Sequence, residues 1–440
     1  MRLLLGVFAC AVSLTASVPL AAQEHQHDPT PPTPQPGVEQ QHDHGAPAAA
    51  SALFPAREGS GTSWLPDNTP MYALHGRAGA WELMGHGNVF AQFLYEAAAE
   101  HRGSAQAGSI NWVMGMARRG IGAGRLGLRT MLSLEPVTVP GCGYPDLLAT
   151  GEFCDGDSIH DRQHPHDLFM ELAVDYERAL RGPLRWQVYA GLAGEPALGP
   201  GAFPHRLSAM PNPIAPTGHH WLDATHITYG VVTAGLFTSR WKAEASIFNG
   251  REPDENRWDL DLAPLDSFAG RFWFAPSPAL VLQVSAGHLN EAEAAHSAEP
   301  RVDVRRVTAS ATYHRQLRTA SVWATTLGWG RNLESGEATH SVMLETSLSL
   351  DDRDVWYGRM EVGGKSAHDL HVHETNDVYI VGKLQGGYTR YLAPRHGLSV
   401  GFGGEMSAAL VPEYLVPRYG NRANLGIGLL VTLRPAAHGM

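Results

Sequence analysis

The sequence predicts an all-β fold, an antiparallel transmembrane β-barrel of about sixteen strands with a disordered N-terminal arm. Strand-like stretches run from Trp81 to Arg434, and the gaps between them alternate between long and short. Short turns on one rim and long loops on the other are typical of bacterial outer-membrane barrels. The long gaps are 97–108, 136–165, 195–224, 250–266, 290–300, 366–376 and 412–420, and the short ones lie near 120–124, 181–183, 238–240, 275–278, 351–354 and 393–396.

Strict alternation within the strands is the second observation. In 125–135 the leucines occupy one face and the charged residues the other, and 167–177, 341–350 and 424–433 repeat this pattern. Because successive strand residues point to opposite faces, we expect lipid outside and water inside. Met170 is predicted to face lipid. The predicted lumen lining is Arg125, Arg129, Glu135, Glu171, Asp175, Lys242, Glu244, Arg359 and Glu361.

This charged lining favours a channel, because barrels of sixteen strands usually leave an aqueous passage. We expect inward loops to constrict it. In the alternative, the same charges pair across the barrel and fill its interior.

The N-terminal region predicts export. Arg2, the apolar run Leu3–Thr15 and the small residues before Gln23 indicate a signal peptide over 1–22. Residues 23–61 form the Pro- and His-rich arm, which cannot bury a core, and 62–440 form the barrel. An even strand number puts both termini on one side, and short turns are periplasmic. We therefore expect the outer membrane of a Gram-negative cell as the location, with the arm in the periplasm.

Several functional classes find no support in the sequence. A net charge of −11 argues against a nucleic-acid partner. No stretch of 18 apolar residues could form a transmembrane helix. No G-x-S-x-G, P-loop or C-x-x-C motif is present, so no catalytic residues are assigned.

Cys142 and Cys154 lie in one long loop of an exported protein. Exported cysteines this close in sequence predict a disulfide bond between them.

Histidines gather where three long loops end. By the predicted topology, all three groups meet at the same rim. Histidine with carboxylate ligands suits a divalent ion such as Zn²⁺, Cu²⁺ or Ni²⁺. The alternative is a set of His–Asp hydrogen bonds that hold the loops without any ion. The candidate ligands are His160, His164, His166, Asp167, His219, His220 and His226, and a third group spans 368–374.

Four segments, 108–116, 161–172, 208–213 and 248–256, carry a resemblance to a group of uncharacterised Gram-negative outer-membrane β-barrel proteins. The chain is also similar, more weakly, to outer-membrane copper-resistance barrels, which join a metal-binding periplasmic arm to a barrel. The arm of this chain has histidine but no methionine between Gln23 and Asn68, which favours a divalent ion over copper(I).

Together these features predict a non-enzymatic outer-membrane barrel, either a channel or a protein that handles a transition metal in the cell envelope. Its partners would be membrane lipid and a metal ion or small solute. The alternatives are a plugged structural or adhesive barrel without transport, and an outer-membrane enzyme.

Overall fold

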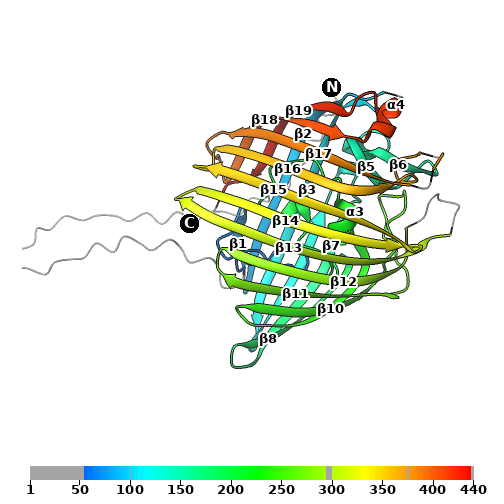
Figure 1. The fold of residues 1–440 in the computed structure, drawn as a ribbon. Helices are drawn as coiled ribbons and strands as arrows, with labels where there is room; N and C mark the ends of the chain where they lie inside the picture. Colours follow the sequence, from blue (N-terminus) through cyan, green and yellow to red (C-terminus); the bar gives the residue numbers. More distant parts are fainter. Residues whose placement is uncertain (1–53, 100, 294–299, 373, 376, 438–440) are drawn as a thin grey trace, which may run out of the picture. The chain divides into compact units, whose positions relative to one another are not determined.

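Antiparallel strands close into a barrel in the computed structural model (Figure 1), which describes residues 54–99, 101–293, 300–372, 374–375 and 377–437. The sheet has seventeen strands, of which the short β1 (Leu74–Ala78) pairs with the first residues of β2. The other sixteen form the wall, as predicted. They are β2 (Trp81–Glu96), β3 (Ser104–Ile121), β4 (Gly124–Leu132), β7 (Phe169–Arg181), β8 (Leu184–Gly194), β9 (Thr228–Phe237), β10 (Trp241–Phe248), β11 (Ser267–Ser277), β12 (Leu280–Glu293), β13 (Val302–Arg318), β14 (Ser321–Glu334), β15 (Glu337–Leu350), β16 (Asp354–Ser366), β17 (Val378–Tyr391), β18 (Leu398–Leu410) and β19 (Ala423–Pro435).

The barrel closes where the last strand meets the first. β19 pairs with β2 in antiparallel register, for example Leu429 with Phe93. Closure leaves no exposed edge in the wall, which a barrel in lipid requires because unpaired backbone groups cannot be hydrated there. The predicted signal peptide and most of the predicted arm, residues 1–53, lie outside the described residues.

The outward face of the wall is apolar. Leu128, Leu344 and Leu429 belong to different strands and all point outward with substantial exposure. An apolar outer band with a polar inner face is the pattern of an outer-membrane barrel. Across the described ranges, no helix combines the length and the apolar character needed to cross a bilayer.

Loop lengths follow the predicted alternation with one exception. β14 and β15 are joined on the long-loop rim by the tight turn Ser335-Gly336. Both residues have positive φ, 47° and 90°, as the two central residues of a type I′ hairpin turn require.

Two predictions about the strands are wrong, one about where a strand ends and one about which way a side chain faces. The strand predicted over 125–135 ends at Leu132, and Glu135 begins the short helix α2 (Glu135–Thr138), in which Pro136 suits the first turn. Met170 is buried instead of facing lipid. Its neighbours Phe169 and Glu171 pair with consecutive residues of β4, so Met170 is an extra residue at a bulge, and a bulge redirects side chains.

Two segments of the chain reach the inner face of the wall. The N-terminal insert is residues 54–73, and the loop insert is residues 195–227, which contains η1 (Phe203–His205), α3 (His219–Leu222) and η2 (Ala224–His226). Residues 54–61, predicted as the end of the disordered arm, are ordered, and Phe54 is buried. The reason is electrostatic, because Glu58 forms ion pairs with both Arg118 and Arg125 of the wall.

Candidate functional site

The inward charges of the wall contact the two inserts. Arg129 donates to the carbonyl of Gly61 over 2.7 Å, and Lys242 donates to the carbonyl of Thr62. Other members of the predicted lining pair with one another or with further wall residues. Arg129 lies 3.0 Å from Glu171, Arg118 lies 3.6 Å from Asp175, and Arg271 lies 2.8 Å from Glu244. The lining predicted to face water is therefore largely covered by protein.

The loop insert is anchored through Arg206. Its Nε lies 2.7 Å from Glu345 of β15, and the same guanidinium pairs with Asp223 of the insert. All three side chains are buried. Two further members of the predicted lining also hold this insert. Arg359 donates to the carbonyl of Ile214 over 2.8 Å, and Glu361 accepts from the backbone N–H of Gly218 over 2.9 Å.

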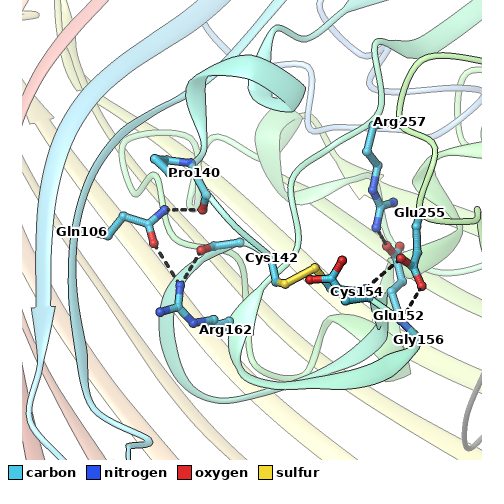
Figure 2. The surroundings of a disulfide bond; sticks show 11 residues. Gln106, Pro140, Cys142, Glu152, Cys154, Gly156, Arg162, Glu255 and Arg257 are labelled. Carbon is cyan, nitrogen blue, oxygen red and sulfur yellow. Dashed lines mark hydrogen bonds and ion pairs between the residues drawn. A yellow bond between two sulfur atoms is a disulfide. The ribbon is translucent and has the colours of Figure 1, made fainter.

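The loop between β4 and β7 forms a hairpin of β5 (Tyr144–Cys154) and β6 (Asp157–Gln163) (Figure 2). The predicted disulfide between Cys142 and Cys154 is present, with Cα atoms 5.5 Å apart. Glu255 of the loop after β10 accepts from the backbone N–H groups of Asp155 and Gly156, 2.8 and 3.1 Å away. The hairpin is thus fixed at its base and at its tip.

Five of the predicted metal ligands come together, and we call His164, His166, His219, His220 and His226 the histidine cluster. The ring centroids of His219 and His226 are 5.0 Å apart, those of His166 and His226 are 5.3 Å apart, and those of His219 and His220 are 5.7 Å apart. His164 joins through His220, with centroids 6.5 Å apart. The prediction that separate loops bring these residues to one place therefore agrees with the geometry.

The other two predicted ligands have partners outside the histidine cluster. The ring of His160 lies tilted against that of His371, with centroids 4.3 Å apart, and its Nδ1 lies 2.9 Å from Asp161. Asp167 lies 3.6 Å from Arg257.

Four of the clustered histidines each have a carboxylate partner. His164 lies 3.0 Å from Glu152, His166 lies 2.9 Å from Glu135, and His219 lies 2.9 Å from Asp223. His220 faces Glu252 at 3.0 Å and Glu293 at 3.8 Å. His226 instead directs Nδ1 at the backbone carbonyl of Asp223, 2.9 Å away. These contacts match the alternative of hydrogen bonds that hold the loops.

Donor atoms converge at one point of the cluster. Within the described ranges, the groups of three or more potential ligands that lie within 4.8 Å of one another contain a single histidine, His220, with Glu252 and Glu293. The five histidines are therefore neighbours without forming one ligand set. Gly151 of the hairpin covers His220 closely, because a Cβ atom at Gly151 would lie 2.1 Å from His220 Nε2.

Burial lowers the pKa of the clustered histidines, and neighbouring carboxylates raise it. Burial lowers the pKa of His220, but Glu252 and Glu293 outweigh this and raise the pKa to about 10. Burial dominates for His219, whose pKa falls to about 4 despite the nearby Asp223. The pKa of His226 lies well below its ordinary value because of burial and the neighbouring His219.

Sequence reasoning missed the partners of these histidines. Glu135, Glu152, Glu252 and Glu293 come from different loops and strand ends, and Arg206 lies in a stretch without any charge pattern. The one signal available was the charge density of 248–256, which contains Glu252.

Comparison with known proteins assigns the chain to no family. No protein-family model matches the sequence, and no curated protein is similar to it. OmpF of Salmonella typhi is 9% identical, with 82% of this chain and 100% of that chain covered and a TM-score of 0.48. An anion-selective porin from Comamonas acidovorans is 10% identical over 81% of this chain and 99% of its own, with a TM-score of 0.45.

The outer membrane channel DcaP of Acinetobacter baumannii is 6% identical over 83% of this chain and 100% of its own, with a TM-score of 0.46. The likeness to copper-resistance barrels has no support in these comparisons. Similarities this low carry no argument about function, which has to come from the chain's own geometry.

Proposed function

We propose that this protein is a non-enzymatic, gated channel of the outer membrane, closed by its two inserts. The observation that carries the proposal is the ionic anchoring of the loop insert, in which Arg206 pairs with Glu345 of the wall. A barrel of sixteen strands is wide enough for an aqueous passage. The passage can therefore be closed only by chain segments that lie inside it, and the two inserts are such segments.

The contacts between the inserts and the wall are polar and charged, which supports a gated channel over a permanently plugged barrel. Arg118, Arg129 and Lys242 of the wall contact the N-terminal insert through charged groups. If an insert leaves the lumen, these side chains become hydrated, as in an open porin. A wall that is always covered would gain more from apolar packing, because burying ion pairs carries a large desolvation cost.

Conductance in planar bilayers tests the proposal. The wild-type channel should be closed most of the time with brief openings. Arg206→Ala should raise the open probability, because it removes the buried cation that joins Asp223 of the insert to Glu345 of the wall. Arg390→Ala is the matched control, since Arg390 pairs with Asp354 in an exposed position. If neither the wild type nor Arg206→Ala conducts, gating is wrong and the plugged structural barrel remains.

The orientation is part of the same proposal. We place the arm in the periplasm and the long loops outside, because short turns of outer-membrane barrels are periplasmic. A tag inserted at the exposed turn Ser335-Gly336 should react with antibody on intact cells, and a tag near Gln35 should react only after lysis. The opposite labelling pattern would reverse the topology.

Divalent metal binding is the second candidate function. His220, Glu252 and Glu293 offer nitrogen and oxygen donors within 4.8 Å, a set that suits Zn²⁺. We expect His220→Gln to remove one Zn²⁺ per chain in isothermal titration of the full-length protein. His164→Gln is the matched control, because His164 belongs to the histidine cluster but not to this donor set. If the wild type and both variants bind the same number of Zn²⁺ ions per chain, His220 is not a zinc ligand and only holds the loops through hydrogen bonds.

A further inference from the structure

Methionines concentrate on one part of the inward face. Met71, Met84, Met114, Met116, Met131 and Met170 belong to a single cluster, which is six of the twelve methionines in the chain. The inner face of an outer-membrane barrel is ordinarily polar, so thioethers gathered there need a reason. The ordinary reason is gap filling, for which the flexible methionine side chain is well suited.

Strand register adds histidine to these methionines. His86 of β2 pairs directly with Met114 of β3, and Met114 pairs with Met131 of β4. Cross-strand partners on one face lie side by side, so the three side chains form a row over three strands. His86 Nε2 lies 3.0 Å from Met114 Sδ.

The loop insert supplies a fourth donor. His205, at the end of η1, places Nε2 3.4 Å from Met131 Sδ. Its ring centroid is 5.4 Å from that of His86, and the Trp112 ring lies beside both imidazoles, 4.7 Å from His205 and 5.3 Å from His86. A cavity of about 90 Å³ is lined by His86, Met114, His205 and Trp112, among others. Donors from the wall and from the insert therefore meet at one cavity.

We propose that His86, Met114, Met131 and His205 form a site for a soft monovalent metal cation, Cu(I) or Ag(I). Thioether ligands select soft ions such as Cu(I), and imidazole binds copper as well as zinc, whereas thioether is not among the usual ligands of Zn²⁺. None of the four donors carries a negative charge, which suits a singly charged ion. The proposal goes beyond channel gating and does not depend on it.

The spacing within each histidine–methionine pair fits two ligands of one ion. Metal bonds of roughly 2.0 Å to nitrogen and about 2.3 Å to sulfur place two donors roughly 3.5 Å apart at a tetrahedral angle. The two histidine–methionine pairs, at 3.0 and 3.4 Å, are close to this separation.

The carboxylates near the cavity are already paired with arginines of the wall, of which Arg118 and Arg129 also line the cavity. Glu171 is held by Arg129 at 3.0 Å, and Glu58 is shared between Arg118 and Arg125. The competing account of the donor pairs is a weak hydrogen bond from each imidazole N–H to a thioether, with no ion.

Silver(I) is the probe of choice, because it needs no reductant and so leaves the disulfide intact. Full-length protein refolded in detergent and titrated in chloride-free buffer should bind Ag(I) with a sulfur shell in X-ray absorption. Cys142 and Cys154 are bonded to each other and Cys10 lies in the predicted signal peptide, so this sulfur can come only from methionine.

The decisive variant is Met114→Leu/Met131→Leu. Leucine keeps the side-chain volume close to that of methionine, so the barrel should still fold. Ag(I) affinity should fall by more than about 100-fold and the sulfur shell should disappear, because losing even an outer partner of a ligand costs roughly 10–100-fold. His205→Phe retains every methionine and should weaken binding while keeping sulfur in the shell.

The matched control is Met360→Leu/Met406→Leu, which removes two exposed methionines from the outer face. It should bind as the wild type does. Binding at histidines of the arm is common to every variant and cancels in these comparisons. A wild-type protein without a sulfur shell, or wild-type affinity in the Met114→Leu/Met131→Leu variant, would overturn the site and leave the hydrogen-bond account.

Discussion

His205 and His220 belong to the same insert but differ in charge at neutral pH, His205 being neutral and His220 positive. His205 faces thioethers and a second histidine, and burial holds its pKa well below the ordinary value. His220 is also buried, but Glu252 and Glu293 raise its pKa to about 10. The difference shows that two buried histidines of one insert can differ in charge when only one of them faces a pair of carboxylates.

The largest effect should come from removing the anchor that holds both histidines in place. Arg206→Ala removes the buried cation shared by Asp223 and Glu345, so that Glu345 keeps only Arg359, 3.5 Å away. Breaking a buried pair in this way costs about 3–5 kcal/mol. We expect a loss of that size in the free energy of unfolding, measured by urea titration. Arg390→Ala, at an exposed pair, should lose far less, because solvent screens exposed ion pairs. Equal losses in the two variants would show that the insert is not held through Arg206.

The charge on His220 predicts a loss of stability at alkaline pH. Its pKa is raised from 6.5 to about 10, so its contribution is complete below pH 6.5 and disappears as the pH rises through 10. One pKa unit corresponds to about 1.4 kcal/mol, so a few kcal/mol should be lost between pH 7 and pH 10. In urea titrations, His220→Gln should remove this fall in the free energy of unfolding between pH 7 and pH 10, and His226→Gln should retain it. A decline identical in wild type and His220→Gln would mean that His220 is neutral.

His205 predicts the opposite pH dependence. Its pKa is depressed by burial, so the unfolded chain takes up a proton below pH 6.5 while the folded protein does not. The free energy of unfolding should therefore fall as the pH drops below 6.5. His205→Phe should flatten this part of the curve, and an unchanged acid slope in that variant would place His205 in contact with water.

The disulfide should have the smallest effect, and only on one of the two histidines. The hairpin that it closes covers His220 through Gly151, whereas the contacts of His205 come from the wall. Cys142→Ser/Cys154→Ser should speed proteolysis of the hairpin and change the alkaline decline by less than about 1 kcal/mol. The fall in the free energy of unfolding below pH 6.5 should stay as in the wild type. A variant that changes only this acid part of the curve would show that the hairpin acts on His205 and not on His220.

Local patterns explain what the sequence could predict. Alternation within 125–132 identifies a strand from a few residues, because neighbouring side chains point to opposite faces. Loop alternation then brings the histidines of 160–167 and 219–226 to one rim, and the structure places five of them together.

Long-range placement explains what the sequence could not predict. The row of His86, Met114 and Met131 depends on the register between three strands, which no single segment encodes. The inserts were equally hidden, because a long loop has the same composition whether it lies outside or folds into the barrel. Glu58 lies in the stretch predicted as the arm, and only its wall partners Arg118 and Arg125 show that it belongs inside.

The pairing of β19 with β2 has a consequence for the order of assembly. The wall cannot seal until the last strand of the chain has been synthesised, whereas both inserts come from earlier in the sequence. A wall that sealed first would enclose Arg118 and Arg125 before Glu58 arrived, and Glu345 before Arg206 arrived. We therefore expect both inserts to be in position before β19 pairs with β2.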